Sequence, residues 1–175
     1  MIPFFLANFV DAGSYPRRIY IDLGIADFYS SLCWIMQNYP VKFDQIYGFE
    51  CARDFSNVAT LAPDVEKCIK GTSAESTGYK DVQEVLGSMS LYHNYVGLDS
   101  DVSTSPPTKG LAHFLREIGV REDDFVVMKM DVEGVEFDLI ERMLSDGSYK
   151  LVDEVRYMHD NGLRFPTHSF SVSAS

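Results

Sequence analysis

Strand-like and helix-like segments alternate along this chain of 175 residues, and no hairpin signal joins consecutive strand-like segments. Strands connected through helices run parallel, because a tight two-residue turn can only join antiparallel strands. The sequence therefore predicts right-handed βαβ units and an α/β fold built on a parallel sheet. A chain of this length is typical of one domain, since compact domains peak at roughly 100–150 residues.

Five segments have the apolar, β-branched and aromatic composition of buried strands. They are residues 19–24, 45–50, 65–69, 125–134 and 151–158. Numbered along the chain, we expect them in the order 3-2-1-4-5, as in Rossmann-like folds. The domain core is expected over residues 18–159, with a polar, Ser-rich tail over residues 160–175.

Helical spacing of apolar residues predicts the connections between these strands. The expected helices cover residues 27–39, 53–61, 111–118 and 136–144. Asp27 is a candidate N-cap of the first helix, Pro63 is expected to close the second, and Gly147 to cap the last. The inward face of the last helix is expected to hold five apolar residues, namely Phe137, Leu139, Ile140, Met143 and Leu144. Residues 71–109 read as a long connection carrying a short strand or helix.

Charge and apolar content exclude several classes of partner. The 15 basic and 26 acidic residues give a formal net charge of −11, which disfavours a generic electrostatic grip on nucleic acid or anionic lipid. The apolar run at residues 2–10 is too short to cross a bilayer core of about 30 Å, and no basic residue precedes it as in a signal peptide. We therefore expect a small-molecule partner and no membrane segment.

The three cysteines, Cys33, Cys51 and Cys68, are odd in number and lack the spacing of a metal site. This pattern predicts buried free thiols rather than a disulfide framework. Free thiols fit a reducing compartment such as the cytoplasm. The four histidines form no HxxxH or HExxH motif, and no metal site is expected.

The candidate site residues follow the strand-like segments, because ligands of open parallel sheets bind at the carboxyl ends of the strands. Asp22 and Gly24 end the first strand, where a glycine lets a ligand approach the backbone; an ordinary βα turn has the same appearance. Glu50 ends the second strand and is placed to accept hydrogen bonds from ribose hydroxyls, with a solvated carboxylate as the alternative.

The segment Lys129-Met130-Asp131-Val132-Glu133 carries ionisable residues at every second position. Strand periodicity places Lys129, Asp131 and Glu133 on one face. Lys129 and Asp131 are expected to neutralise one another, with Asp131 and Glu133 reaching the site, although a purely structural ion pair gives the same pattern.

Glu154 and His159, around the fifth strand, complete the candidates. A histidine at the carboxyl end of a strand has a pKa suited to a general base, but solitary loop histidines commonly face solvent.

Four blocks of this sequence, YIDLG at 20–24, YGFE at 47–50, LAHFL at 111–115 and MKMDVEGVE at 128–136, resemble the FkbM-type S-adenosylmethionine-dependent methyltransferases. The resemblance covers about residues 18–159, and the last block is its most specific part. It implies a class I methyltransferase fold and transfer of a methyl group to a hydroxyl oxygen of a sugar or small metabolite.

The resemblance also implies roles for individual residues. Asp22, Gly24 and Glu50 correspond to positions that hold the methionine part and ribose of S-adenosylmethionine. Asp131 and Glu133 would line the cofactor and acceptor side of the pocket, and Asp131 or His159 would be the general base.

The two further strands that complete a methyltransferase sheet are expected to be missing or reduced here. A catalytically inactive binding or interaction domain is therefore the alternative reading, and a nicotinamide-dependent oxidoreductase is a third, which the incomplete GxGxxG motif disfavours.

Overall fold

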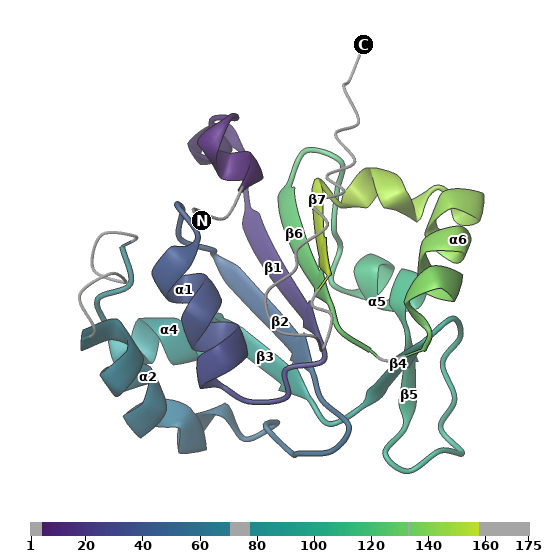
Figure 1. Cartoon of the computed structure of the whole chain (residues 1–175), viewed down its shortest axis with the longest axis horizontal. Helices are drawn as coiled ribbons and strands as arrows, with labels where there is room; N and C mark the ends of the chain where they lie inside the picture. The colour runs from purple at the N-terminus through teal and green to yellow at the C-terminus, as the bar shows by residue number, and fades with distance from the viewer. Residues whose placement is uncertain (1–4, 71–77, 133, 158–175) are drawn as a thin grey trace.

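A computed structural model describes residues 5–70, 78–132 and 134–157 of the chain. Its main sheet has five strands, all parallel, in the order β3-β2-β1-β6-β7 (Figure 1). The strands are β1 (Arg18–Leu23), β2 (Gln45–Phe49), β3 (Met89–Tyr92), β6 (Phe125–Met130) and β7 (Glu154–Tyr157). The expected α/β class and parallel sheet are confirmed, and this topology is compatible with a Rossmann-like fold.

The third strand of the sheet is not the one that the sequence predicted. Residues 65–69 belong to α2 (Ala62–Lys70), which follows a short 3-10 helix, Val58–Leu61, whereas the predicted helix covered residues 53–61. Pro63 begins this helix instead of closing one, because a proline in the first helical turn removes no intrahelical hydrogen bond. The buried residues Val65, Cys68 and Ile69 recur at helical spacing and cover the sheet.

The stretch expected to be a long connection contains more regular structure than predicted. It holds α4 (Val82–Ser88), the strand β3, and a separate two-stranded parallel sheet of β4 (Tyr95–Gly97) and β5 (Thr108–Gly110). Asp81 caps α4 by accepting the backbone N–H of Glu84. Because β3 follows α4 without a break and has only four residues, its pattern is too short to stand out.

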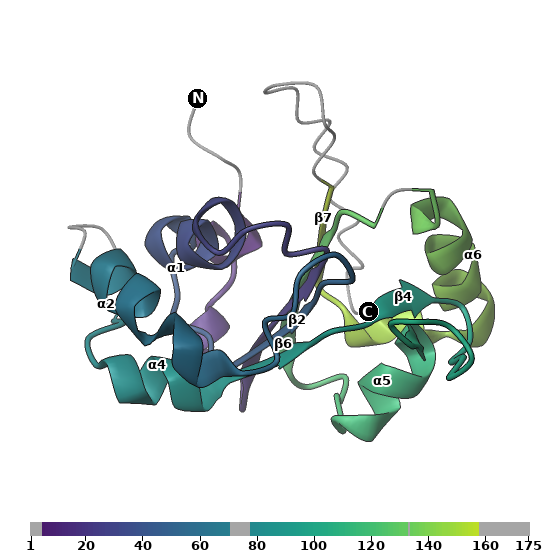
Figure 2. The ribbon, with the colours of Figure 1, turned by 90° about the horizontal axis from the view of Figure 1, so that it is seen from below.

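Helices cover both faces of the main sheet (Figure 2). On one face lie α2, α4 and α1 (Trp34–Asn38), which continues from a π-helical turn at Tyr29–Cys33; on the other lie α5 (Leu111–Glu117) and α6 (Glu136–Asp146). Strand β1 contributes side chains to both apolar cores. Tyr20 packs on the α1 side, and alternate residues pack on the α6 side, namely Ile19, Ile21 and Leu23. This alternation is the period-two pattern of a strand buried on both faces.

The inward face of α6 is narrower than predicted. Leu139 and Met143 are buried, whereas Phe137 and Leu144 are 81% and 61% exposed. At about 100° per residue, Phe137 and Leu144 lie on the side of the helix opposite to Leu139. Gly147 ends the helix with φ 80°, as expected for a left-handed C-cap.

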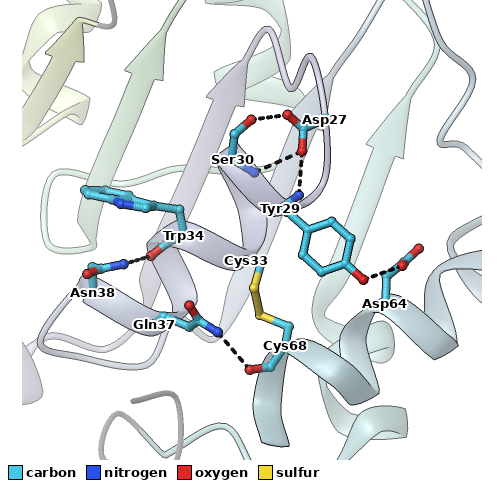
Figure 3. Close-up of a disulfide and its surroundings, with 9 residues drawn as sticks. All are labelled: Asp27, Tyr29, Ser30, Cys33, Trp34, Gln37, Asn38, Asp64 and Cys68. Carbon is cyan, nitrogen blue, oxygen red and sulfur yellow. Dashed lines mark hydrogen bonds between the residues drawn. A yellow bond between two sulfur atoms is a disulfide. The ribbon is translucent and has the colours of Figure 1, made fainter. Parts of the chain in front are cut away.

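Cys33 and Cys68 form a disulfide with a Cα–Cα distance of 5.8 Å, which joins the π-helical turn to α2 (Figure 3). The prediction that all three cysteines are free thiols was therefore wrong, and only Cys51 is free. The two residues are 35 positions apart and meet because their helices pack side by side on the sheet. In the same region Asp27 accepts the backbone N–H groups of Tyr29 and Ser30, although the N-cap position is Phe28, one residue later than predicted.

Candidate functional site

A cavity of about 640 Å³ lies at the carboxyl ends of the strands. The strand order reverses between β1 and β6, so the loops after these strands diverge to opposite faces and leave space between them. The lining residues of the cavity lie at or just after the ends of β1, β2, β3 and β6, and in β4. These are Gly24, Ala26, Phe49, Glu50, Cys51, Ala52, Arg53, Asn94, Tyr95, Val96, Asp131, Val132 and Val135.

Glu50 is fixed in the wall of this cavity by two backbone amides. The backbone N–H of Ala26 donates to its Oε2 at 2.8 Å, and that of Ala52 donates to its Oε1 at 2.6 Å. The residue is only 8% exposed. Since each oxygen of an ionised carboxylate can accept two hydrogen bonds, both oxygens retain capacity for a ligand. Glu50 thus lies where the sequence predicted, at the tip of β2.

Gly24 brings the loop after β1 into direct contact with the end of β6. Its φ is 95°, and a Cβ at this position would lie 2.0 Å from the backbone oxygen of Asp131. The backbone N–H groups of Gly24 and Ile25 both donate to the carbonyl of Phe49, which ties the same loop to β2. Only glycine allows this approach, and the loop is therefore held between two strand ends.

Asp131 also lines the cavity, and it extends the β6 ladder by donating its N–H to the carbonyl of Leu23. Its Oδ2 is 3.6 Å from the Nζ of Lys129, and its side chain is 33% exposed. The expected ion pair between Lys129 and Asp131 is present. The two acidic strand ends, Glu50 and Asp131, thus line one cavity.

Asp22 does not line the cavity. It lies opposite Lys129 in the β1–β6 register, and its side chain points toward the α1 face and is fully buried. Burial raises the pKa of Asp22, and the nearby Lys129 ammonium and the hydroxyls of Ser31 and Tyr20 oppose this shift. Because β1 continues to Leu23, Asp22 is inside the strand rather than at its tip. Its link to the cavity lining is the hydrogen bond that it accepts from Lys129.

The remaining candidates divide into two groups. Glu133 and His159 lie outside the described residues. Glu154 begins β7, so it is at the amino end of the strand, away from the cavity, contrary to the expectation that this region carries site residues. Its carboxylate accepts hydrogen bonds from the Tyr39 hydroxyl, the Leu6 N–H and Arg156. Glu154 therefore anchors the N-terminal segment on the sheet.

No protein-family model, curated protein or solved structure matches this chain.

Several lining residues were missed by the sequence analysis. Arg53 adds a cation to the rim, and Asn94, Tyr95 and Val96 form a wall that ends the connection from β3 into β4. Tyr95 is 44% exposed, although it lines the cavity. In the sequence, this wall is marked only by an apolar patch at residues 91–98. That pattern does not indicate which strand end the patch covers.

The described part of the chain holds neither a metal site nor a membrane-spanning helix. No group of three His, Cys, Asp or Glu side chains there could hold a metal ion. No helix among the same residues is long and apolar enough to cross a membrane.

Proposed function

We propose that this chain binds S-adenosylmethionine in the cavity and transfers its methyl group to a hydroxyl oxygen of a sugar or small metabolite. The observation that carries the proposal is the pair of acidic strand ends, Glu50 and Asp131, which line one cavity at the point where the strand order reverses. The MKMDVEGVE block, which resembles the FkbM-type enzymes, supplies Asp131.

The cavity fits a nucleoside cofactor in size and in chemistry. Its volume of about 640 Å³ lies within the range of about 300–1,000 Å³ typical of small-molecule sites. Glu50 offers two carboxylate oxygens, already oriented by backbone amides, to the vicinal hydroxyls of a ribose. Phe49, Val96 and Val135 supply the apolar surface that a base requires.

The charge of the cavity suits a cationic ligand. Glu50 and Asp131 contribute two carboxylates against the single guanidinium of Arg53 among the described lining residues. A sulfonium supplies a methyl group that is already activated for displacement. An acidic wall stabilises its positive charge, and the low exposure of Glu50 limits screening by water.

The protein has two tasks in such a transfer, alignment and proton removal. The new O–C bond forms as the C–S bond breaks, the bonding electrons stay on sulfur, and the hydroxyl proton must go to a base. Asp131, half-exposed on the cavity wall, is the proposed base within the described residues, and His159 remains the alternative.

The test is calorimetric titration with S-adenosylmethionine, S-adenosylhomocysteine and NAD. We expect both adenosyl ligands to bind and the Glu50→Gln variant to bind them at least about 10-fold more weakly, because the ribose loses a charged acceptor. Glu66→Gln is the matched control, since Glu66 is exposed on α2 and pairs with Lys70.

Each other outcome has a defined meaning. Failure of both adenosyl ligands to bind would refute the proposal, and preferential binding of NAD would favour an oxidoreductase. Binding without methyl transfer to any hydroxyl compound in a panel of sugars and metabolites would favour the inactive binding domain.

A further inference from the structure

The ammonium of Lys129 connects the interior of the sheet to the cavity. Its Nζ donates to Asp22 Oδ1 at 3.0 Å and to the carbonyl oxygen of Gly24, and lies 3.6 Å from Asp131 Oδ2. The Lys129 side chain is only 7% exposed. One buried cation thus contacts a buried carboxylate, the glycine loop and the carboxylate on the cavity wall.

We propose that Lys129 is a positioning residue that keeps Asp131 ionised and fixed on the cavity wall, with Asp22 as the buried counter-charge that limits this effect. This inference rests on the proposed function, because it concerns the carboxylate proposed there as the general base and as part of the acidic lining that suits a sulfonium. Nothing in the sequence pattern distinguished this role from a simple structural pair.

The arrangement divides one positive charge between two carboxylates. Asp22 lies directly across from Lys129 in the β1–β6 ladder, is fully buried, and also accepts from Ser31 and Tyr20. Asp131 lies beyond hydrogen-bond distance but close enough for a strong Coulomb attraction in a partly buried setting. Removing the charge of either carboxylate is therefore expected to change how strongly Lys129 attracts the other.

The third contact fixes the geometry. The Gly24 carbonyl accepts from Lys129, while the Gly24 Cα is packed against the Asp131 backbone. Lys129 therefore holds both the loop and the carboxylate that it adjoins. Among the described residues, Arg156 lies beside Lys129 in the β6–β7 register and lines a small cavity with it on the α1 face. The other charged groups near this cluster are Glu50 and Arg53, which line the main cavity, and Glu136 at the start of α6, which accepts from the N–H of Gly134.

The readout is the ratio of the affinities for S-adenosylmethionine and S-adenosylhomocysteine as a function of pH. The two ligands differ only in the methyl group and its positive charge, so the ratio reports the negative charge near the sulfur. Protonation of a nearby carboxylate lowers the ratio, and the midpoint of this fall measures its ionisation. Repeating the titration in Glu50→Gln isolates the contribution of Asp131.

Three variants are expected to change the midpoint of this titration in different ways. Lys129→Met is expected to raise the midpoint by about 1 pH unit or more, because Asp131 loses its neighbouring cation. Lys129→Arg, which keeps the charge, is expected to leave it within a few tenths of a unit. Asp22→Asn is expected to lower it, since Lys129 then has Asp131 as its one remaining carboxylate partner among the described contacts.

Lys129→Met leaves Asp22 buried beside no cation and can fail to fold. The double variant Asp22→Asn/Lys129→Met avoids this, and its midpoint is expected to lie above that of Asp22→Asn. Equal midpoints in this pair would overturn the inference while leaving the proposed function intact. Absence of binding by the unmodified chain would instead defeat the proposed function itself.

Discussion

A Cβ atom on Gly24 would lie 2.0 Å from the backbone oxygen of Asp131, so the loop after β1 and the end of β6 are in contact through a position that has no side chain. Glu50 holds the same loop from the other side through the Ala26 N–H. The loop after β1 is therefore held by contacts with the ends of two other strands, β2 and β6.

Gly24→Ala is expected to destabilise the fold by more than about 2 kcal/mol, because it adds a left-handed backbone penalty to a backbone overlap. It is also expected to abolish binding of S-adenosylhomocysteine. Gly87→Ala is the matched control: it lies in α4 with no atom within 4 Å of the added methyl group, and is expected to stabilise the protein by about 0.5–1 kcal/mol. Equal urea midpoints for the two variants would contradict this account.

The Cys33–Cys68 disulfide gives a prediction that needs only thiol counting. Alkylation of the unfolded chain is expected to label Cys51 alone without reductant and all three cysteines after reduction, which mass spectrometry measures directly. Replacing both bridged residues with serine is expected to cost about 4 kcal/mol, from closure of a 35-residue loop in the unfolded state. Three labelled thiols in the unreduced protein would show that the bridge does not form.

Asp124 makes stability depend on pH. Its burial raises its pKa, but the hydrogen bonds from Arg17 and from the N–H of Arg121, with the charges of both arginines, outweigh this and leave the pKa below its ordinary value. Stability from this group is therefore complete above the unfolded pKa of about 4 and is lost as the pH falls below it toward the folded value.

The check is urea unfolding at pH 7 and pH 3. We expect Asp124→Asn to lose stability mainly at pH 7, which reduces the difference between the two pH values. Asp123→Asn, next to it and exposed, is expected to leave that difference unchanged, because its pair with Arg121 lies in solvent.

Glu154 and Tyr39 form a buried pair that can be tested by a double-mutant cycle. Glu154→Ala is expected to cost about 3–5 kcal/mol, because it leaves Arg156 and the Tyr39 hydroxyl without their shared acceptor. Tyr39→Phe alone is expected to cost about 1 kcal/mol. In the Tyr39→Phe background, Glu154→Ala should cost less than it does alone, and strict additivity of the two changes would disprove the coupling.

The parts of the fold that the sequence predicts are those with long or strongly marked segments. β1, β2 and β6 are apolar runs at the centre of the sheet, and α6 has a clear C-cap at Gly147. Residues 65–69 were misread because a five-residue apolar run fits a strand and a helix equally well. The true third strand has four residues and no turn before it.

The site was predictable at the strand ends and not beyond them. Glu50 and Gly24 could be placed because parallel strands end at a common edge. Asp22 was misplaced, because it lies inside β1 and not after its end. Its side chain points toward the α1 face and not into the cavity. The disulfide depends on helix packing across 35 residues, and no local pattern encodes such a contact.

The cavity wall formed by Asn94, Tyr95 and Val96 belongs to the ribbon of β4 and β5, and this has a consequence for how the cavity can change. This ribbon pairs its two strands with each other and is separate from the five-stranded ladder. Substitutions at Asn94 and Tyr95 can thus change the shape of the cavity while the five-stranded sheet keeps its hydrogen bonds. Val96 also lines the cavity but packs in the apolar core with Phe49 and Phe114, so a change there is expected to alter stability as well as the shape of the cavity.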